Sequence, residues 1–285
     1  MAVIAFTSFS GSPGVSTAAL AFAVHWPRPV VLFEADTANV TSAMPGFFRS
    51  NLPPTIAGLD KVAVAYARDI LTWQDLLDPD TKLSIAVHDL PTVGQMPIPA
   101  LPTGHRLWVV PGFFHLTIVD GVRGLWGRLP RLFRALSDAG IDVVVDLSRT
   151  NPNDIRLPIL DQADRVLVCA SATMVDLNRV YRRLELPDLA DRLQGIGRAE
   201  KYRLLLGEAP AEAVAPSDFA AHLMPVLATL PFDPDGAATF SLGKLDPRPN
   251  RNIYRQGIRR AVTVLGDETR PTEQKTDDSL ERKAG

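Results

Sequence analysis

A short loop near the N-terminus carries residue types that bind phosphate in proteins. It follows the apolar run 2–6 and precedes an alanine-rich stretch over residues 16–24 that is typical of a helix. Glycines allow the backbone to approach a phosphate closely, and the free amides and dipole at a helix start favour an anion. We therefore predict a phosphate-binding loop that consists of Gly11, Ser12, Pro13, Gly14, Val15, Ser16, Thr17 and Ala18. Ser16 and Thr17 have an alternative role as helix caps.

Two carboxylates follow apolar runs further along the chain. Asp36 comes shortly after the run 30–33, and Asp146 comes directly after the run 143–145. In an open parallel sheet, ligands bind beyond the carboxyl ends of the strands. If the protein is active, we predict that Asp36 and Asp146 are its catalytic residues, and if Mg²⁺ is bound, that Asp146 is the carboxylate beside it. The alternatives are a helix cap or an exposed loop for Glu34 and Asp36, and a hydrogen-bond partner at the sheet edge for Asp146.

The elements that would hold these residues alternate between apolar strands and helices. Strand-like runs cover residues 2–6, 30–33, 107–110, 141–146, 163–168, 202–206 and 225–230. Helical spacing covers residues 16–24, 122–139, 175–184, 219–223 and 252–265. Continuously apolar strands indicate a sheet that is covered on both faces. The sequence predicts an α/β fold with a mostly parallel, doubly wound sheet and helices on both faces.

The alternation of apolar strands and helices is less clear between residues 40 and 100. It predicts a helix over 61–71 with a short continuation over 73–77, a strand over 83–87 and a proline-rich surface loop over 91–102. From residue 266 the sequence turns to polar and charged residues with no apolar periodicity. We therefore predict one domain over residues 1–265 and a disordered charged tail over residues 266–285.

The composition limits the classes of partner and compartment. The chain has 285 residues, 22% of them charged, and a formal net charge of −2, so no strong overall charge attracts nucleic acid or acidic lipid. Its single cysteine, Cys169, cannot form an internal disulfide and lies in an apolar run typical of a buried strand. The N-terminus lacks the basic region of a signal peptide, and no apolar stretch reaches membrane-spanning length. We expect a soluble, cytoplasmic protein.

The order of these segments resembles the ParA/MinD family of P-loop ATPases over residues 1–245. The shared features are a Gly-x-Pro-Gly-Val loop between a strand and a helix, followed by strands that lead to Asp36 and Asp146. Residues 163–168 are similar to the family's AD-x-apolar strand, and residues 230–234, with Gly243 after them, are similar to its (I/L)P-x-D…G segment. The C-terminal part has a weaker similarity to Tad-type pilus-assembly accessory proteins. The resemblance implies a P-loop fold, a homodimer, and ATP with Mg²⁺ as cofactors.

The loop departs from the family pattern at the positions that hold the nucleotide. The family's signature lysine falls at Ser12, its phosphate-gripping lysine at Thr17 and its Mg²⁺-binding hydroxyl at Ala18. Residues 1–60 contain no lysine at all. A charge-assisted contact contributes about 1.5–3 kcal/mol, so we expect ATP and Mg²⁺ to bind weakly or not at all.

Two further positions bear on nucleotide binding. The asparagine with which the family reads adenine appears here as Gly207. Arg28 and Arg149 lie near predicted strand ends and are therefore candidates for a replacement cation, with an ordinary surface position as the alternative.

These features support three hypotheses about function. The first is a MinD/ParA-like positioning or assembly factor with impaired or absent ATP hydrolysis that scaffolds a secretion, pilus or partition apparatus. The second is an active ATPase or GTPase with an atypical P-loop that acts in chromosome or plasmid partitioning. The third is a nicotinamide or flavin protein, in which Glu34 would bind a ribose, although the loop lacks the Gly-x-Gly-x-x-Gly pattern.

Two segments are candidates for partner contacts. Five arginines repeat at helical spacing, which predicts an exposed face or, as the alternative, a docking surface for an acidic partner, a membrane or DNA. They are Arg248, Arg251, Arg255, Arg259 and Arg260. The aromatic residues Phe113 and Phe114 predict core packing or, as the alternative, an exposed patch for a partner.

Overall fold

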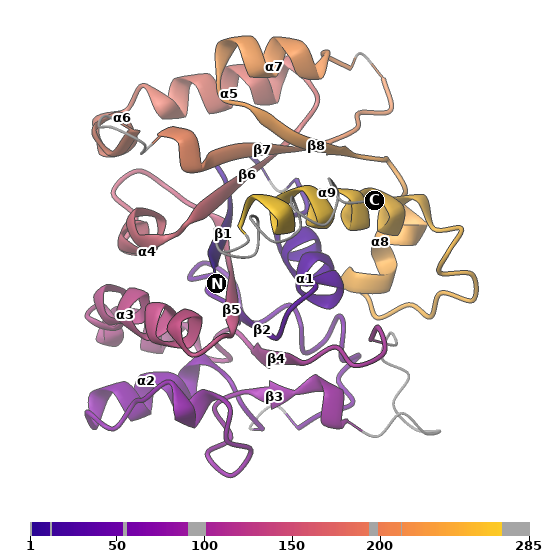
Figure 1. Ribbon diagram of the computed structural model, residues 1–285. Helices are drawn as coiled ribbons and strands as arrows, with labels where there is room; N and C mark the ends of the chain where they lie inside the picture. The colour runs from indigo at the N-terminus through magenta and orange to yellow at the C-terminus, as the bar shows by residue number, and fades with distance from the viewer. Residues whose placement is uncertain are drawn as a thin grey trace, which may run out of the picture.

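The computed structural model describes residues 2–11, 13–53, 56–90, 101–193, 199–211 and 213–269. Its centre is an eight-stranded sheet with the strand order β3-β4-β2-β5-β1-β6-β7-β8 (Figure 1). Every strand pairs in parallel with its neighbours except β3, which is antiparallel to β4 at one edge. The strands are β1 (Val3–Ser8), β2 (Val30–Glu34), β3 (Ile85–Ala86), β4 (Leu107–Val110), β5 (Asp142–Arg149), β6 (Arg165–Ser171), β7 (Tyr202–Gly207) and β8 (Val226–Leu230). The prediction of a mostly parallel, doubly wound α/β sheet is confirmed.

The central strands are buried along most of their length because helices cover both faces of the sheet. All residues of β1 are buried. Successive side chains of a strand point to opposite faces, so Ile4 and Phe6 of β1 enter one hydrophobic core and Val3 and Ala5 enter the other. This arrangement explains why the sequence of β1 shows no alternation between apolar and polar residues.

Each face of the sheet carries its own set of helices (Figure 1). One face is covered by α1 (Val15–His25), α8 (Pro234–Ser241) and α9 (Ile253–Glu268). The other is covered by α2 (Leu59–Ala67), α3 (Leu125–Asp138), α4 (Leu157–Gln162), α5 (Met174–Leu184), α6 (Pro187–Leu193) and α7 (Pro216–His222). Four short 3₁₀ helices complete the described elements: η1 (Gln74–Leu76), η2 (Val87–Asp89), η3 (Leu116–Val122) and η4 (Ala199–Lys201).

Helix α1 is buried on nearly all sides, because it lies between the sheet and α9. Its alanines allow this close approach, and Phe22 packs edge-on against Phe6 of β1 with ring centroids 5.0 Å apart. The helix therefore holds the preceding loop rigidly against the carboxyl edge of the sheet.

Several predicted elements differ from the structure. The helix predicted over 61–71 lies at Leu59–Ala67, and the strand predicted over 83–87 has only two residues. Helix α6 was not predicted. Helix α9 ends at Glu268, so residues 266–268 of the predicted disordered tail are helical instead. Residues 270–285 lie outside the described part, and the disordered tail there stays a prediction. Of the loop predicted over 91–102, only residues 101 and 102 are described.

Two predictions about exposure are corrected by the fold. Phe113 is fully buried in the core, so the alternative of an exposed aromatic patch is wrong. Arg255 is also buried and lies over the ring of Phe240, with its guanidinium carbon 5.4 Å from the ring centroid. The predicted exposed arginine face is therefore interrupted, because Arg255 packs between α9 and α8. Cys169 is buried in β6, as expected.

No helix within the described ranges has the length and apolar character that crossing a bilayer would require.

Candidate functional site

The predicted phosphate loop joins β1 to α1 at the carboxyl edge of the sheet. Gly14 adopts a left-handed conformation, with φ 80° and ψ 31°, immediately before the first residue of α1. This backbone conformation favours glycine, since a Cβ atom would strain it. No side chain caps the helix start, so the capping role considered for Ser16 and Thr17 is wrong and both lie inside α1. Ser12 lies outside the described residues.

Two cavities flank this loop. The first, which we call the acidic cavity, has a volume of about 240 Å³ and is lined by loop residues together with Glu34, Asp36 and Ser148. The second, which we call the apolar cavity, has a volume of about 430 Å³ and lies beyond the ends of β6, β7 and β8. Residues Gly14 and Thr17 line both cavities. The loop thus separates two neighbouring spaces at the edge where ligands bind in open parallel sheets.

Asp146 lies at the carboxyl end of β5 but lines neither cavity. It is 2% exposed. The pKa of its carboxyl group is raised to about 7, mainly by burial and also by the charges of Glu34 and Asp36. Hydrogen bonds from the Ser16 hydroxyl and the Ser148 amide partly offset this rise. The Ser148 amide donates over 2.8 Å. Near neutral pH this acid is therefore partly protonated, and it faces other acids rather than a cation.

Asp36 lines the acidic cavity, but its carboxylate is engaged in a local turn. It accepts hydrogen bonds from the amide of Ala38 over 2.8 Å and from the amide and side chain of Asn39 over 3.3 and 2.9 Å. Such a turn is a common structural role for aspartate. The structure thus brings Asp36 and Asp146 to the same edge, as predicted, with the carboxylate of Asp36 held by its own loop.

Glu34 has a structural role that the sequence did not indicate. Its buried carboxylate accepts hydrogen bonds from the amides of Ser42, Ala43 and Gly112 over 2.8, 2.8 and 2.9 Å. The hydroxyls of Thr41 and Ser42 also donate to it. Because these donors use the carboxylate oxygens, Glu34 is not available to a ribose, and the hypothesis of a nicotinamide or flavin protein loses its main support.

None of the described residues that line either cavity is a lysine or an arginine. Arg28, a predicted replacement cation, lies at the opposite edge of the sheet, where its Nε donates to Asp142 over 2.5 Å at the start of β5. That prediction is wrong, because Arg28 precedes β2 instead of following it. Arg149 is exposed at the correct edge but lines neither cavity.

A buried arginine that the sequence did not reveal stands at this edge. Arg156 donates to the carbonyl oxygens of Ala35, Leu147 and Arg149 over 2.6–2.9 Å, and its side chain forms a two-point pair with Asp154. A guanidinium group has five N–H donors, and these contacts engage all of them. Arg156 therefore joins the ends of β2 and β5 and has no donor left for a phosphate.

One arginine approaches the loop from outside. Arg179 of α5 places its Nη1 atom 4.0 Å from the position that a Cβ atom on Gly11 would occupy. Its side chain is 56% exposed and lies 3.6 Å from a carboxylate oxygen of Asp176. Arg179 was not identified from the sequence, since only the fold brings α5 beside the loop.

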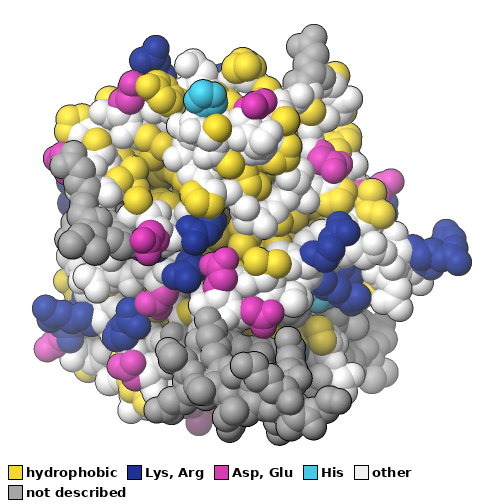
Figure 2. Space-filling view, turned by 45° about the horizontal axis from the view of Figure 1, so that its top comes forward, with side chains coloured by type: hydrophobic (Ala, Val, Ile, Leu, Met, Phe, Trp, Pro, Cys, Tyr) yellow, Lys and Arg dark blue, Asp and Glu magenta, His cyan; other side chains and the backbone are white. Residues whose placement is uncertain are grey.

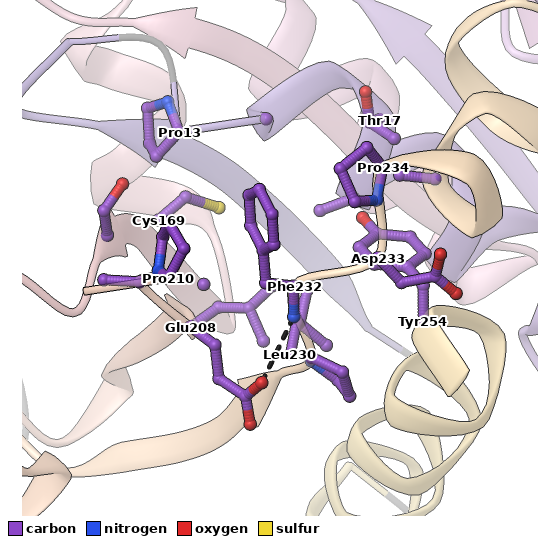
Figure 3. A pocket seen from close by; sticks show the side chains of 18 of the residues that line it. Pro13, Thr17, Cys169, Glu208, Pro210, Leu230, Phe232, Asp233, Pro234 and Tyr254 are labelled. Carbon is purple, nitrogen blue, oxygen red and sulfur yellow. Dashed lines mark hydrogen bonds between the residues drawn. The ribbon is translucent and has the colours of Figure 1, made fainter. Parts of the chain in front are cut away.

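The apolar cavity gathers residues from three strands, β6, β7 and β8, and three helices, α1, α8 and α9, and Figure 3 shows it from close by. Cys169, Leu205 and Leu230 line it from the sheet, and Tyr254 reaches it from α9. Figure 3 shows Phe232 near its centre, with the Phe232 amide donating to the Glu208 carboxylate over 3.2 Å. Gly207 lines this cavity, so the position at which the resemblance places an adenine-reading asparagine carries no side chain.

Glu208, Phe232 and Tyr254 were not predicted as site residues. Glu208 and Phe232 come just after β7 and β8, so the rule that ligands bind beyond strand ends would have indicated both. Tyr254 lies on the last helix, and no local pattern connects it to this edge.

Comparisons with known proteins agree with this architecture. No protein-family model matches the chain, and no curated protein matches it in sequence. The chain is similar to a solved ParA family ATPase from Chlorobium tepidum, with a TM-score of 0.66, 14% identity, and coverage of 92% of this chain and 97% of that one. It is also similar to MinD from Pyrococcus horikoshii in complex with Mg-ADP, with a TM-score of 0.63, 12% identity, and coverage of 93% and 95%. A MinC:MinD complex from Aquifex aeolicus gives a TM-score of 0.55, 14% identity, and coverage of 95% and 98%. The chain therefore has the ParA/MinD-type P-loop ATPase fold.

Proposed function

We propose that this protein is a ParA/MinD-like positioning or assembly factor with impaired or absent ATP hydrolysis. In this proposal it acts in the cytoplasm as a scaffold for a larger secretion, pilus or partition machine. The observation that carries the proposal is the lack of lysine and arginine among the described residues that line the two cavities beside the loop.

The electrostatics of the site disfavour a triphosphate. A phosphate at the loop would meet the amides of α1, but also the nearby carboxylates of Asp36 and Asp146, with no lysine to offset them. Phosphoryl transfer depends on positioned cations that neutralise developing charge. The backbone cradle alone would hold an anion weakly.

The residues present also do not fit a Mg²⁺ ion held as the resemblance implies. Ala18 offers a methyl group at the position of the expected hydroxyl ligand. Asp146 is buried and accepts a hydrogen bond from the Ser148 amide. Because its pKa is raised to about 7, a proton would compete with a metal ion for its carboxylate. We therefore assign no catalytic step to Asp36 or Asp146.

A scaffold needs surfaces for partners, and one end of the molecule offers exposed apolar side chains. Met174, Val175 and Tyr181 of α5 are 63%, 57% and 42% exposed. Figure 2 shows hydrophobic side chains exposed among charged ones on the side of the molecule that turns toward the viewer from the top of Figure 1. The solved complex of MinD with MinC supports a protein partner, and a homodimer is part of the proposal.

A thermal-shift titration with Mg-ATP and Mg-GTP tests the proposal, together with a phosphate-release assay. We expect neither nucleotide to raise the melting temperature more than inorganic phosphate does, and no turnover. A double variant, Thr17→Lys with Ala18→Ser, restores the two missing functional groups and is expected to gain a Mg²⁺-dependent shift. A tight Mg²⁺-dependent shift in the unmodified protein that Asp146→Ala abolishes would overturn the proposal.

The position of Arg179 favours a second candidate function, an active ATPase or GTPase with an atypical P-loop in partitioning. Its guanidinium group lies beside Gly11 and would supply the cation that the loop lacks. In that case Arg179→Ala would abolish nucleotide-dependent stabilisation and turnover. Arg182→Ala, on the same helix, is the matched control, since Arg182 contacts only Glu185 and the ring of Tyr181 among the described residues.

A further inference from the structure

A cluster of basic side chains lies where α1, α8 and α9 pack against one another (Figure 1). His25 ends α1, Phe240 belongs to α8, and Arg255 and Arg259 lie about one turn apart on α9. The ring of His25 and the guanidinium group of Arg255 both face the ring of Phe240, at 5.9 and 5.4 Å from its centroid. None of these four residues lines either cavity beside the phosphate loop, so the cluster is separate from the site described above.

Arg255 is buried without a hydrogen bond. The residue is 6% exposed, and its guanidinium group donates to no acceptor within the described part of the chain. Its ion pair with Asp246 spans 3.8 Å from Nε to Oδ2, which is too long for a hydrogen bond. Buried polar groups usually have hydrogen-bond partners, and the buried Arg156 engages all its donors. Arg255 therefore lacks the acceptors that such a group needs.

Asp246 offsets the charge of Arg255 only in part, because its own loop holds it. Its Oδ1 atom accepts a hydrogen bond from the amide of Arg248 over 3.0 Å, and its Oδ2 atom accepts one from the side chain of Asn252 over 2.9 Å. These bonds fix the carboxylate beside the guanidinium group of Arg255 without a direct hydrogen bond between them.

The cluster holds more positive than negative charge. Among the described residues Arg259 has no acidic partner, and its Nη1 atom lies 3.5 Å from the neutral side-chain oxygen of Asn250. Burial and the charge of Arg259 lower the pKa of Arg255, whereas the charge of Asp246 raises it. Two guanidinium groups thus share one carboxylate, and a buried charge without full compensation is costly.

His25 adds a neutral hydrogen-bonding group to this cluster. Its Nε2 atom is buried and has no hydrogen-bond partner among the described residues. Burial, together with the charges of Arg255, Arg259 and His105, lowers the pKa of His25 to about 3, so the ring carries no charge near neutral pH. A neutral imidazole donates one hydrogen bond when the proton lies on Nε2, and an anion would accept it.

We infer that Arg255, Arg259 and His25 form a binding site for a small oxyanion such as a phosphate group. A phosphate group offers several acceptor oxygens and forms two-point contacts with a guanidinium group. It would also supply the negative charge that the cluster lacks. Because Arg255 is only 6% exposed, the site suits a free anion or a phosphate group at the end of a larger molecule. This inference goes beyond the proposed function, since it needs neither a nucleotide nor the loop.

Calorimetric titration of the full chain with inorganic phosphate, in chloride buffer at constant ionic strength, tests the inference. We expect saturable binding, with a dissociation constant that rises by about tenfold or more in Arg255→Met, as the loss of charge-assisted hydrogen bonds requires. Arg255→Lys keeps the charge but lacks the planar fork, so its dissociation constant should lie between the two. Arg260→Met, the same change at an exposed position of α9, is the matched control and should bind phosphate normally.

Melting curves give a second measurement and identify any variant that fails to fold. Without phosphate, Arg255→Met should melt at or above the temperature of the unmodified protein, because it removes a buried charge that has no hydrogen bond. With phosphate, the unmodified protein and Arg260→Met should gain stability and Arg255→Met should not.

Three results would overturn the inference. They are no saturable phosphate binding by the unmodified protein, equal dissociation constants for that protein and Arg255→Met, and a clearly lower melting temperature of Arg255→Met without phosphate. Titration with glycerol 3-phosphate distinguishes the two sources of the ligand. Binding that depends on Arg255 indicates a phosphate group on a larger molecule, whereas binding of inorganic phosphate alone indicates a free anion.

Discussion

Glu34 and Asp146 occupy paired positions on the adjacent parallel strands β2 and β5. Both side chains are buried, at 5% and 2% exposure, yet their surroundings differ. Glu34 accepts hydrogen bonds from a neighbouring loop and from Gly112, whereas Asp146 has few donors and a pKa raised to about 7 by burial. The same edge of the sheet thus contains two different carboxylates. The one of Glu34 stabilises the fold through its hydrogen bonds, whereas ionisation of the one of Asp146 is disfavoured by burial.

The first prediction concerns Asp146 and pH. The pKa of Asp146 in the folded protein is about 7, above the ordinary aspartate value of 3.8 that applies in the unfolded chain. Its contribution to stability is therefore complete below the unfolded pKa and is lost as pH rises through the folded pKa. We expect Asp146→Asn to be more stable than the unmodified protein at pH 8, by about 1–4 kcal/mol, and equally stable near pH 4.

Urea denaturation at pH 4 and pH 8 measures this difference. Asp120→Asn, at an exposed position paired with Arg123, is the control and should change little at either pH. A variant at Asp146 that is less stable than the unmodified protein at both pH values would contradict the raised pKa.

The second prediction concerns the loop that Glu34 holds. Glu34→Ala would leave the buried amides of Ala43 and Gly112 without acceptors, and each such loss costs about 1–3 kcal/mol. We expect a loss of at least about 2 kcal/mol in the free energy of unfolding, from those two amides alone. Hydrogen exchange should increase at the amides of residues 42 and 43.

Asp36→Ala is the matched comparison, because Asp36 bonds only within an exposed turn. We expect it to cost less than about 1 kcal/mol. If both variants lost the same stability, the structural role assigned to Glu34 would be wrong.

The third prediction concerns His25 at the end of α1. Burial, together with the positive charges of Arg255, Arg259 and His105, lowers the pKa of this histidine to about 3. The unfolded chain binds a proton near pH 6.5 while the folded protein does not, so stability falls as pH decreases from about 6.5 toward 3. His25→Phe keeps a ring against Phe240, whose centroid lies 5.9 Å away, and removes the titrating group.

We expect His25→Phe to melt at a higher temperature than the unmodified protein at pH 5, and to differ little at pH 8. Between about pH 4 and pH 6.5, the free energy of unfolding rises with pH because of His25 and falls with pH because of Asp146. Comparing each variant with the unmodified protein at each pH separates the two contributions. His222→Phe, at an exposed position on α7, should show no such pH dependence.

Much of the fold follows from local sequence. The apolar run before Gly11, the alanines of α1 and the left-handed Gly14 specify a strand, a tight loop and a helix through short-range sterics and burial. The same local order places Asp36 and Asp146 at the carboxyl edge, because consecutive parallel strands end on the same side. The lack of lysine over residues 1–60 is likewise a property of the sequence alone.

The tertiary structure decided which distant groups the side chains at this edge of the sheet contact. Glu34 finds its donors eight residues away and across the sheet at Gly112, and Arg156 reaches Ala35 at a separation of 121 residues. The cavity that Glu208, Phe232 and Tyr254 share depends on the packing of α9 against β8. Spacing along the chain determines which face of an element is apolar, but it carries no information about contacts between distant segments. The sequence by itself therefore determined a phosphate-type loop without its cations, and only the folded chain decided that Glu34 is structural, that Arg28 lies at the wrong edge and that an apolar cavity opens beside the loop.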